Sequence, residues 1–203
     1  MANDIIGTIG KLGVGKSLYG VIWGYDGVCD GRPLFSNIRL NFKHIPLKTL
    51  EDITNANAIN YYNKTGKNGR MILDELWKLA DNRKCMGLLA ELTDIVLIQS
   101  RKMHLDVYFT QQFLQIDPRI AFCVTQWIAP KVYPVKCSKF NPPTLLIVER
   151  CDGDYNELPP KRIKCAPYLN LFNSDENPYI IKDMVSPERI KAILERIKEE
   201  EQK

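Results

Sequence analysis

The chain lacks the features that mark membrane and secreted proteins. No apolar run approaches the length of a membrane-spanning helix. The first residues, Met1-Ala2-Asn3-Asp4, do not form the charged start and apolar core of a secretory signal. Internal repeats and low-complexity tracts are also missing. We therefore expect an intracellular, soluble protein with no membrane partner.

The spacing of a zinc site is missing as well. The sequence has only two histidines, His44 and His104, and both lie far from any pair of cysteines. No CxxC pair occurs. We expect the six cysteines to be buried thiols, as is usual for intracellular proteins. They are Cys29, Cys85, Cys123, Cys137, Cys151 and Cys165.

Charge of one sign is not strongly in excess. The 28 basic and 24 acidic residues give a formal net charge of +4, which indicates a nucleic-acid partner only if the cations are clustered. Hydrophobic residues make up 45% of the chain and charged residues 26%, which is ordinary for a globular protein. The length of 203 residues predicts one domain over residues 1–203 with a full core.

Residues 10–17 read GKLGVGKS, the G-x-x-x-x-G-K-[ST] pattern of a phosphate-binding P-loop. An apolar run precedes it at 5–9, and an apolar stretch of helical character follows. Glycines let backbone N–H groups turn toward a phosphate, and the helix N-terminus adds positive dipole. Lys16 is placed to reach the β- and γ-phosphates, and Ser17 to ligate Mg²⁺. The predicted nucleotide-binding residues are Gly10, Lys11, Leu12, Gly13, Val14, Gly15, Lys16, Ser17 and Leu18.

The rest of the chain predicts an α/β fold. Strands are predicted at 4–9, 33–38, 71–75, 105–110, 124–133 and 144–150. Helices are predicted at 16–25, 48–60, 76–82, 87–100, near 118, and from Ser186 to the C-terminus. A basic loop is expected at 61–70, and turns at 151–185. This alternation favours a mostly parallel sheet flanked by helices, with a C-terminal β-hairpin and helix. Ligands bind at the carboxyl ends of such strands.

Two acids close the strand that begins at Met71. Asp74 is predicted to hold Mg²⁺ together with Ser17. Glu75 is placed to orient and activate a water for attack on the γ-phosphate, which favours hydrolysis over transfer to an acceptor. The alternative is that these acids cap the next helix.

A polar residue and a cation flank the strand at 105–110. Gln111, or its neighbour Gln112, could contact the γ-phosphate or the attacking water, or could simply bond a loop backbone. Arg101, followed by Lys102, could act as an arginine finger on a neighbouring subunit. From the residues alone, a charge that satisfies the dipole at a helix C-terminus is the favoured explanation. Arg119 is a second candidate for the finger.

Together GKLGVGKS, MILDE and SRKMHLDVYFTQQ resemble the FtsK–HerA superfamily of P-loop ATPases. Its members include DNA translocases, viral genome-packaging ATPases and morphogenesis ATPases of filamentous phages. The phrase LFSNI also looks like the phage group. Size and overall sequence look closest to the packaging ATPases of turreted icosahedral viruses of hyperthermophilic archaea. The resemblance covers about residues 4–130 and leaves about 131–203 as an extension.

The resemblance implies a RecA-like fold that binds ATP and Mg²⁺. It assigns the Walker A loop to residues 10–17 and the Walker B acids to Asp74 and Glu75. It makes Gln111 the sensor and Arg101 the finger that acts in trans. It further implies a hexameric ring around double-stranded DNA, a capsid vertex protein as partner, and a place in the host cytoplasm. A hyperthermophilic host would also make disulfides credible.

Three basic clusters could contact DNA. They are Lys64, Lys67 and Arg70; Lys131, Lys136 and Lys139; and Lys161, Arg162 and Lys164. Any one such cluster is more often a solvated surface. Two other functions stay open at this point: a small nucleotide or metabolite kinase, and a virion morphogenesis ATPase that moves no DNA. No R-x-x-x-R-type lid supports the kinase.

Overall fold

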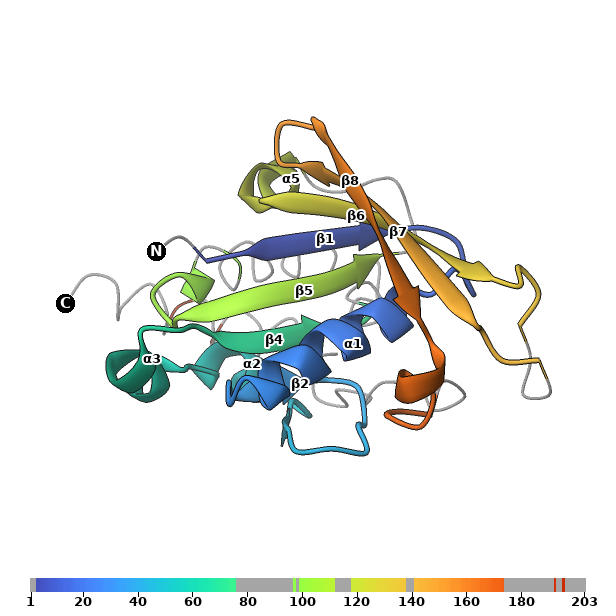
Figure 1. The fold of residues 1–203 in the computed structure, drawn as a ribbon. Helices are drawn as coiled ribbons and strands as arrows, with labels where there is room; N and C mark the ends of the chain where they lie inside the picture. The colour runs from blue at the N-terminus through green and yellow to red at the C-terminus, as the bar shows by residue number, and fades with distance from the viewer. Residues whose placement is uncertain are drawn as a thin grey trace.

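An eight-stranded sheet forms the centre of the molecule (Figure 1). The computed structural model describes residues 3–75, 97, 99–111, 118–137, 141–173, 192 and 195. The strand order is β3-β2-β4-β5-β1-β6-β7-β8. The strands from β3 to β6 are parallel, whereas β7 and β8 are antiparallel additions at one edge.

The strands span Ile5–Ile9 (β1), Leu34–Ser36 (β2), Ile45–Pro46 (β3), Gly69–Leu73 (β4), Leu105–Gln111 (β5), Gln126–Tyr133 (β6), Leu145–Asp152 (β7) and Glu157–Lys164 (β8). The helices span Lys16–Cys29 (α1), Leu50–Asn55 (α2), Ile59–Thr65 (α3) and Pro118–Cys123 (α5), and a 3₁₀ turn, η3, spans Ala166–Tyr168. The predicted α/β class is therefore confirmed, including the hairpin of β6 and β7. The predicted helix at 76–82 lies outside the described residues, as do most of the helices predicted at 87–100 and from Ser186 onward.

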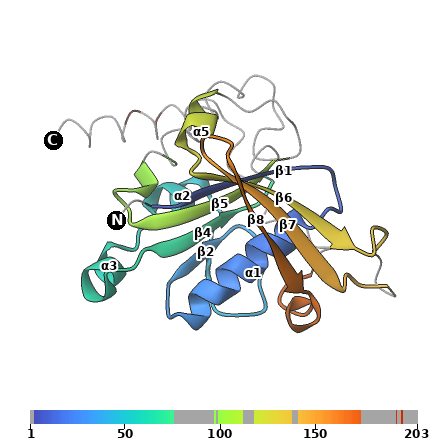
Figure 2. The same cartoon turned by 45° about the horizontal axis from the view of Figure 1, so that its top comes forward.

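The central strands are buried on both faces, so they read as continuous apolar runs. On one face α1 packs along the sheet (Figure 2). Two of its glycines permit this close approach, because a Cβ at Gly20 would lie 2.4 Å from Tyr108 and one at Gly24 would lie 2.7 Å from Ile72. On the other face Phe109 packs with Leu97 and with residues of α2 and β6.

Two segments that were expected to be irregular are regular. The predicted loop at 61–70 is wrong, because Ile59–Thr65 forms α3 and β4 begins at Gly69. Stacking of Tyr62 on His104, with ring centroids 3.8 Å apart, docks this short polar helix. The predicted turns at 151–185 are also wrong for β8. Its two prolines are tolerated because an edge strand needs ladder hydrogen bonds on one side only.

The helix predicted at 48–60 is two helices. Thr49 and Asp52 form a capping box that starts α2, and Ala56 is extended and ends it. No helix in the described part of the chain is long and apolar enough to cross a membrane.

Candidate nucleotide site

The loop between β1 and α1 is shaped by glycines in the left-handed region. Gly13 has φ 78° and Gly15 has φ 97°. Gly15 also presses against the β6–β7 hairpin, because a Cβ there would lie 2.7 Å from Val132 and 2.9 Å from Leu146. As the N-cap of α1, Gly15 offers no side-chain oxygen, and the first turn contains no acid. The N–H groups at this end are therefore left for an anion.

Lys16 folds back over its own loop. Its Nζ donates to the carbonyl oxygens of Gly10 at 2.7 Å and Lys11 at 2.8 Å. The residue is only 6% exposed. Burial lowers the pKa of Lys16, while the carboxylates of Asp74 and Glu75 act to raise it. The ammonium group thus lies inside the loop, bonded to two of the loop's own carbonyl oxygens.

Ser17 and Asp74 meet across the sheet. The hydroxyl of Ser17 donates to the two carboxylate oxygens of Asp74 at 2.9 and 3.1 Å. The half-buried hydroxyl of Ser17 and the buried carboxylate of Asp74 are hard oxygen ligands, so this pair fits Mg²⁺. In the described part of the chain, no three or more His, Cys, Asp or Glu side chains are grouped so that they could hold a metal ion by themselves.

Asn37, which follows β2, fixes the backbone of Asp74. Its amide nitrogen donates to the Asp74 carbonyl oxygen at 2.8 Å, and its amide oxygen accepts from the Asp74 N–H at 2.8 Å. Asn37 is fully buried. Sequence reasoning did not select this residue. The available signal was a polar residue directly after a buried strand, at the edge where the P-loop begins.

Thr110 holds the same turn from the other side. Its hydroxyl donates to Asp74 Oδ1 at 2.7 Å and accepts from the backbone N–H of Glu75 at 2.8 Å. Glu75 has φ 49°, a strained value for a residue with a side chain. The hydrogen bond from its N–H therefore stabilises an unusual backbone at the residue predicted to activate water. Thr110 was also missed from the sequence, although its neighbour Gln111 was selected.

The environment of Asp74 opposes its ionisation. Burial raises the pKa of Asp74, and the hydrogen bonds from Thr110 and Ser17 act in the opposite direction. A cation bound beside the carboxylate would favour the ionised form. The carboxylate is thus better suited to a site that holds a positive ion than to an empty one.

The structure places Gln111 and Arg101 at opposite ends of β5. Gln111 ends β5 and pairs with Ile9, the last residue before the P-loop, so its backbone lies beside the site. Arg101 is exposed in the turn before β5. The length of β5 separates it from the P-loop edge by roughly 20 Å. Arg101 is therefore not brought to the nucleotide site of its own chain. Gln112 and the side chain of Arg119 lie outside the described residues.

The chain matches no protein-family model and no curated protein. Solved structures do match. The N-terminal domain of zonular occludens toxin from Neisseria meningitidis has a TM-score of 0.51 at 13% identity, covering 85% of this chain and 100% of that one. A KaiC-like protein from Pyrococcus horikoshii has a TM-score of 0.51 at 10% identity, covering 79% and 82%. The genome packaging NTPase of Sulfolobus turreted icosahedral virus 2, in complex with ATP-gammaS, has a TM-score of 0.48 at 14% identity, covering 81% and 98%.

The chain has the RecA-like P-loop ATPase fold. The resemblance seen in the sequence is confirmed as far as the fold. Within this fold β5 lies between β1 and β4. The two motifs nevertheless meet, because Ser17 reaches across the end of β5 to Asp74 and Thr110 of β5 bonds the same carboxylate.

Proposed function

We propose that this chain is a Mg²⁺-dependent ATP hydrolase that drives double-stranded viral DNA into a preformed capsid. The observation that carries the hydrolase is the contact between Ser17 and Asp74 beside a P-loop that encloses Lys16. Such a site gathers a cation for phosphate, two oxygen ligands for a metal, and the acid Glu75 for a water.

Each residue then has a role in hydrolysis. Lys16 exchanges its two carbonyl partners for the β- and γ-phosphates and neutralises their charge. Ser17 and Asp74 hold Mg²⁺, which supplies charge stabilisation to the transferring phosphoryl group when bound. Glu75 accepts a proton from the attacking water. Gln111, at the end of β5, senses the γ-phosphate.

The motor role rests on the sequence resemblance and on clustered cations. We propose a hexameric ring in which Arg101 reaches the nucleotide of the adjacent subunit. The exposure of Arg101 and its distance from its own P-loop support action in trans. We further propose that the ring binds DNA without sequence preference, docks on a capsid vertex protein and works in the host cytoplasm.

The test measures phosphate release with and without duplex DNA, and with no other acceptor added. We expect wild-type protein to hydrolyse ATP and to be stimulated by DNA. Glu75→Gln should bind ATP but not hydrolyse it, whereas Lys16→Ala should lose binding. Hydrolysis that survives in Glu75→Gln would overturn the catalytic assignment. An assembled protein that neither binds DNA nor responds to it would overturn the motor.

A further inference from the structure

The sheet formed by β6, β7 and β8 has one face toward α1 and one away from it. On the inner face Val132, Leu146 and Val148 are buried in the core. The strand register aligns the outer side chains in two rows. One row is Tyr133, Leu145 and Lys164, and the other is Lys131, Ile147 and Arg162. We call these six residues the basic face.

The basic face joins two clusters that are separate in the sequence. Lys131 comes from one, and Arg162 and Lys164 come from the other; all three are exposed. The middle residue of each row, Leu145 or Ile147, is a half-buried apolar residue of β7, which lies between β6 and β8. The nearest carboxylate along these strands, Glu149, is bonded to Lys131 at 2.5 Å. Residues 118–148 and 158–174 contain no Asp or Glu, so Glu149 offsets the charge of Lys131, but no acid lies close in the sequence to Arg162 and Lys164.

Other cations are less suited to a broad anionic partner. Arg70 donates to the carbonyl oxygen of Trp23 and lies 4.6 Å from the centroid of its ring. Lys161 pairs with Val148, on the inner face. Its pKa is lowered by burial and by Arg150, and Asp26 of α1 acts in the opposite direction. Lys64 lies in α3 and Lys67 follows it, and both are exposed.

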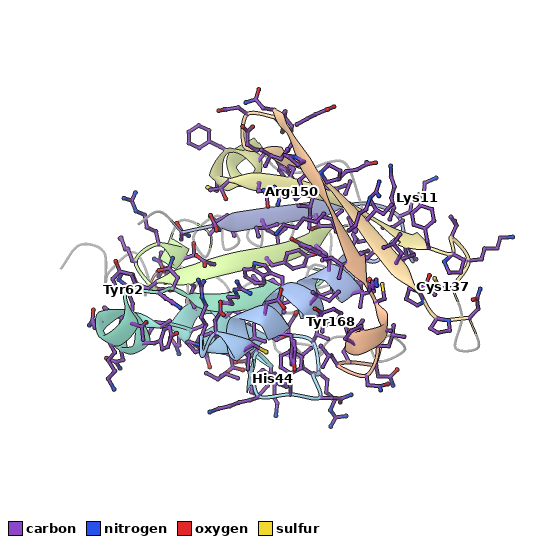
Figure 3. All side chains as sticks on the ribbon, viewed as in Figure 1. Lys11, His44, Tyr62, Cys137, Arg150 and Tyr168 are labelled. Atoms are coloured by element: carbon purple, nitrogen blue, oxygen red, sulfur yellow. The ribbon has the colours of Figure 1, made fainter. Side chains whose placement is uncertain are left out.

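The α3 cluster lies far from the basic face. In Figure 3, Tyr62 marks α3 at one side of the molecule and Cys137 marks the β6–β7 loop at the other. The two surfaces therefore cannot be parts of a single small contact, and a matched change in each can separate their roles.

We infer that the basic face is the surface on which the phosphate backbone of double-stranded DNA rests. This inference rests on the proposed function and adds the contact surface to it. Arg162 and Lys164 are about 7 Å apart along β8, and Lys131 is about 10 Å away across β7. Such a triangle of cations matches a polymer with one charge about every 3.4 Å along each strand. Contacts to phosphates alone carry no base sequence, as a packaging motor requires.

The experiment compares two double variants of the full chain. Arg162→Glu with Lys164→Glu alters the basic face, and Lys64→Glu with Lys67→Glu is the matched control near α3. Each replacement removes two charge units, so both variants fall from +4 to a formal net charge of 0. Binding to a mixed-sequence duplex is measured by fluorescence anisotropy. Unfolding midpoints and hydrolysis without DNA are measured alongside and should match wild type.

We expect the face variant to bind duplex DNA at least tenfold more weakly and the control to stay within twofold of wild type. In a neutral version, Arg162→Gln with Lys164→Gln, the slope of log affinity against log salt should fall by about 2. If wild type binds DNA and the face variant binds equally well, or the control loses as much, the inference is overturned while the proposed function stands. If wild type binds no duplex, both fail. Binding of an acidic polypeptide in place of DNA would also overturn the inference.

Discussion

Asn37 and Asp74 are joined by two hydrogen bonds of 2.8 Å that continue the β2–β4 ladder by one residue. The last backbone pair of that ladder is Ser36 with Ile72. Beyond it the side-chain amide of Asn37 takes the place of a peptide group, offering one donor and one acceptor. The peptide of Asp74, the acid proposed to hold Mg²⁺, is thereby held although neither strand extends this far. Asn37 is thus a positioning residue for Asp74.

Replacing Asn37 should impair hydrolysis more than binding. Asn37→Ala leaves the buried N–H and C=O of Asp74 without this partner, which costs about 1–3 kcal/mol for each group. Because the backbone that carries the Asp74 carboxylate is then less firmly held, kcat should fall on the order of 10- to 100-fold. ATP affinity should change little, and more Mg²⁺ should be needed for half-maximal activity. Steady-state kinetics over a Mg²⁺ series measures both effects.

Ser36→Ala is the matched control for Asn37→Ala. Ser36 is also fully buried, but its hydroxyl bonds only the backbone of Ile38. We expect it to lower stability without changing the Mg²⁺ requirement. An equal shift in the two variants would show that Asn37 acts through general stability and not through Asp74.

Thr110→Val should slow hydrolysis by removing hydrogen bonds to Asp74 and Glu75. The change keeps the shape of the side chain but removes the hydroxyl that bonds Asp74 and the N–H of Glu75. We expect kcat to fall on the order of 10- to 100-fold. Thr110→Ser retains the hydroxyl and should recover most of the rate. A serine variant as slow as the valine variant would point to packing as the cause.

The two left-handed glycines of the P-loop should differ in their tolerance of a methyl group. Gly13→Ala meets nothing within 4 Å and should cost only the backbone strain, roughly 1–2 kcal/mol. Gly15→Ala adds a clash with Val132 and should cost more and weaken ATP binding. Denaturant unfolding and an ATP-dependent thermal shift measure this. Val132→Ala should partly rescue Gly15→Ala, and additive costs in the double variant would refute the contact.

Arg101→Ala should leave ATP binding intact but slow hydrolysis by about 10³-fold or more in the assembled protein. The physical reason is that the exposed guanidinium lies too far from its own P-loop to act there. Mixing Arg101→Ala with Glu75→Gln subunits should restore part of the activity, because some interfaces then hold both native residues. A mixture as inactive as its components would exclude action in trans.

The capping box of α2 should make a pH-dependent contribution to stability. Burial acts to raise the pKa of Asp52, but hydrogen bonds from the N–H groups of Lys48 and Thr49 outweigh it and hold the pKa below 3.8. The contribution of the charge is thus present above pH 3.8 and is lost as the pH falls through the folded-state pKa. Asp52→Asn should cost about 0.5–1 kcal/mol at neutral pH.

Urea unfolding at pH 7 and near pH 3 tests this sign. The stability difference between wild type and Asp52→Asn should shrink at the lower pH. Thr49→Ala removes the N-cap hydroxyl and should cost about 1 kcal/mol at both pH values. A difference for Asp52→Asn that grows on acidification would contradict the direction of the pKa shift.

The sequence predicted the parts of the site that are local. The P-loop and the acids Asp74 and Glu75 belong to short sequence patterns, so their chemistry can be predicted before the fold is known. Asn37 and Thr110 act on Asp74 from 37 and 36 residues away, so no local pattern reveals them. Their roles depend on strand order, which places the ends of β2 and β5 on either side of β4.

The segments that were mispredicted depend on tertiary contacts in the same way. The helix α3 has polar and aromatic residues without a clear apolar stripe, and Tyr62 reaches its stacking partner His104 only in the folded chain. Pro159 and Pro160 favour a turn locally, yet pairing with β7 makes this segment a strand.

The packing of Gly15 against Val132 and Leu146 couples the phosphate loop to the β6–β7 hairpin. No methyl group fits between the phosphate loop and these two side chains. A displacement of Gly15 toward these side chains would therefore be taken up by β6 or β7, since a packed interior transmits strain. The next residues along these strands, Tyr133 and Leu145, project from the opposite side of the same sheet. Such a displacement would thus have to cross only one layer of backbone to reach the outer surface.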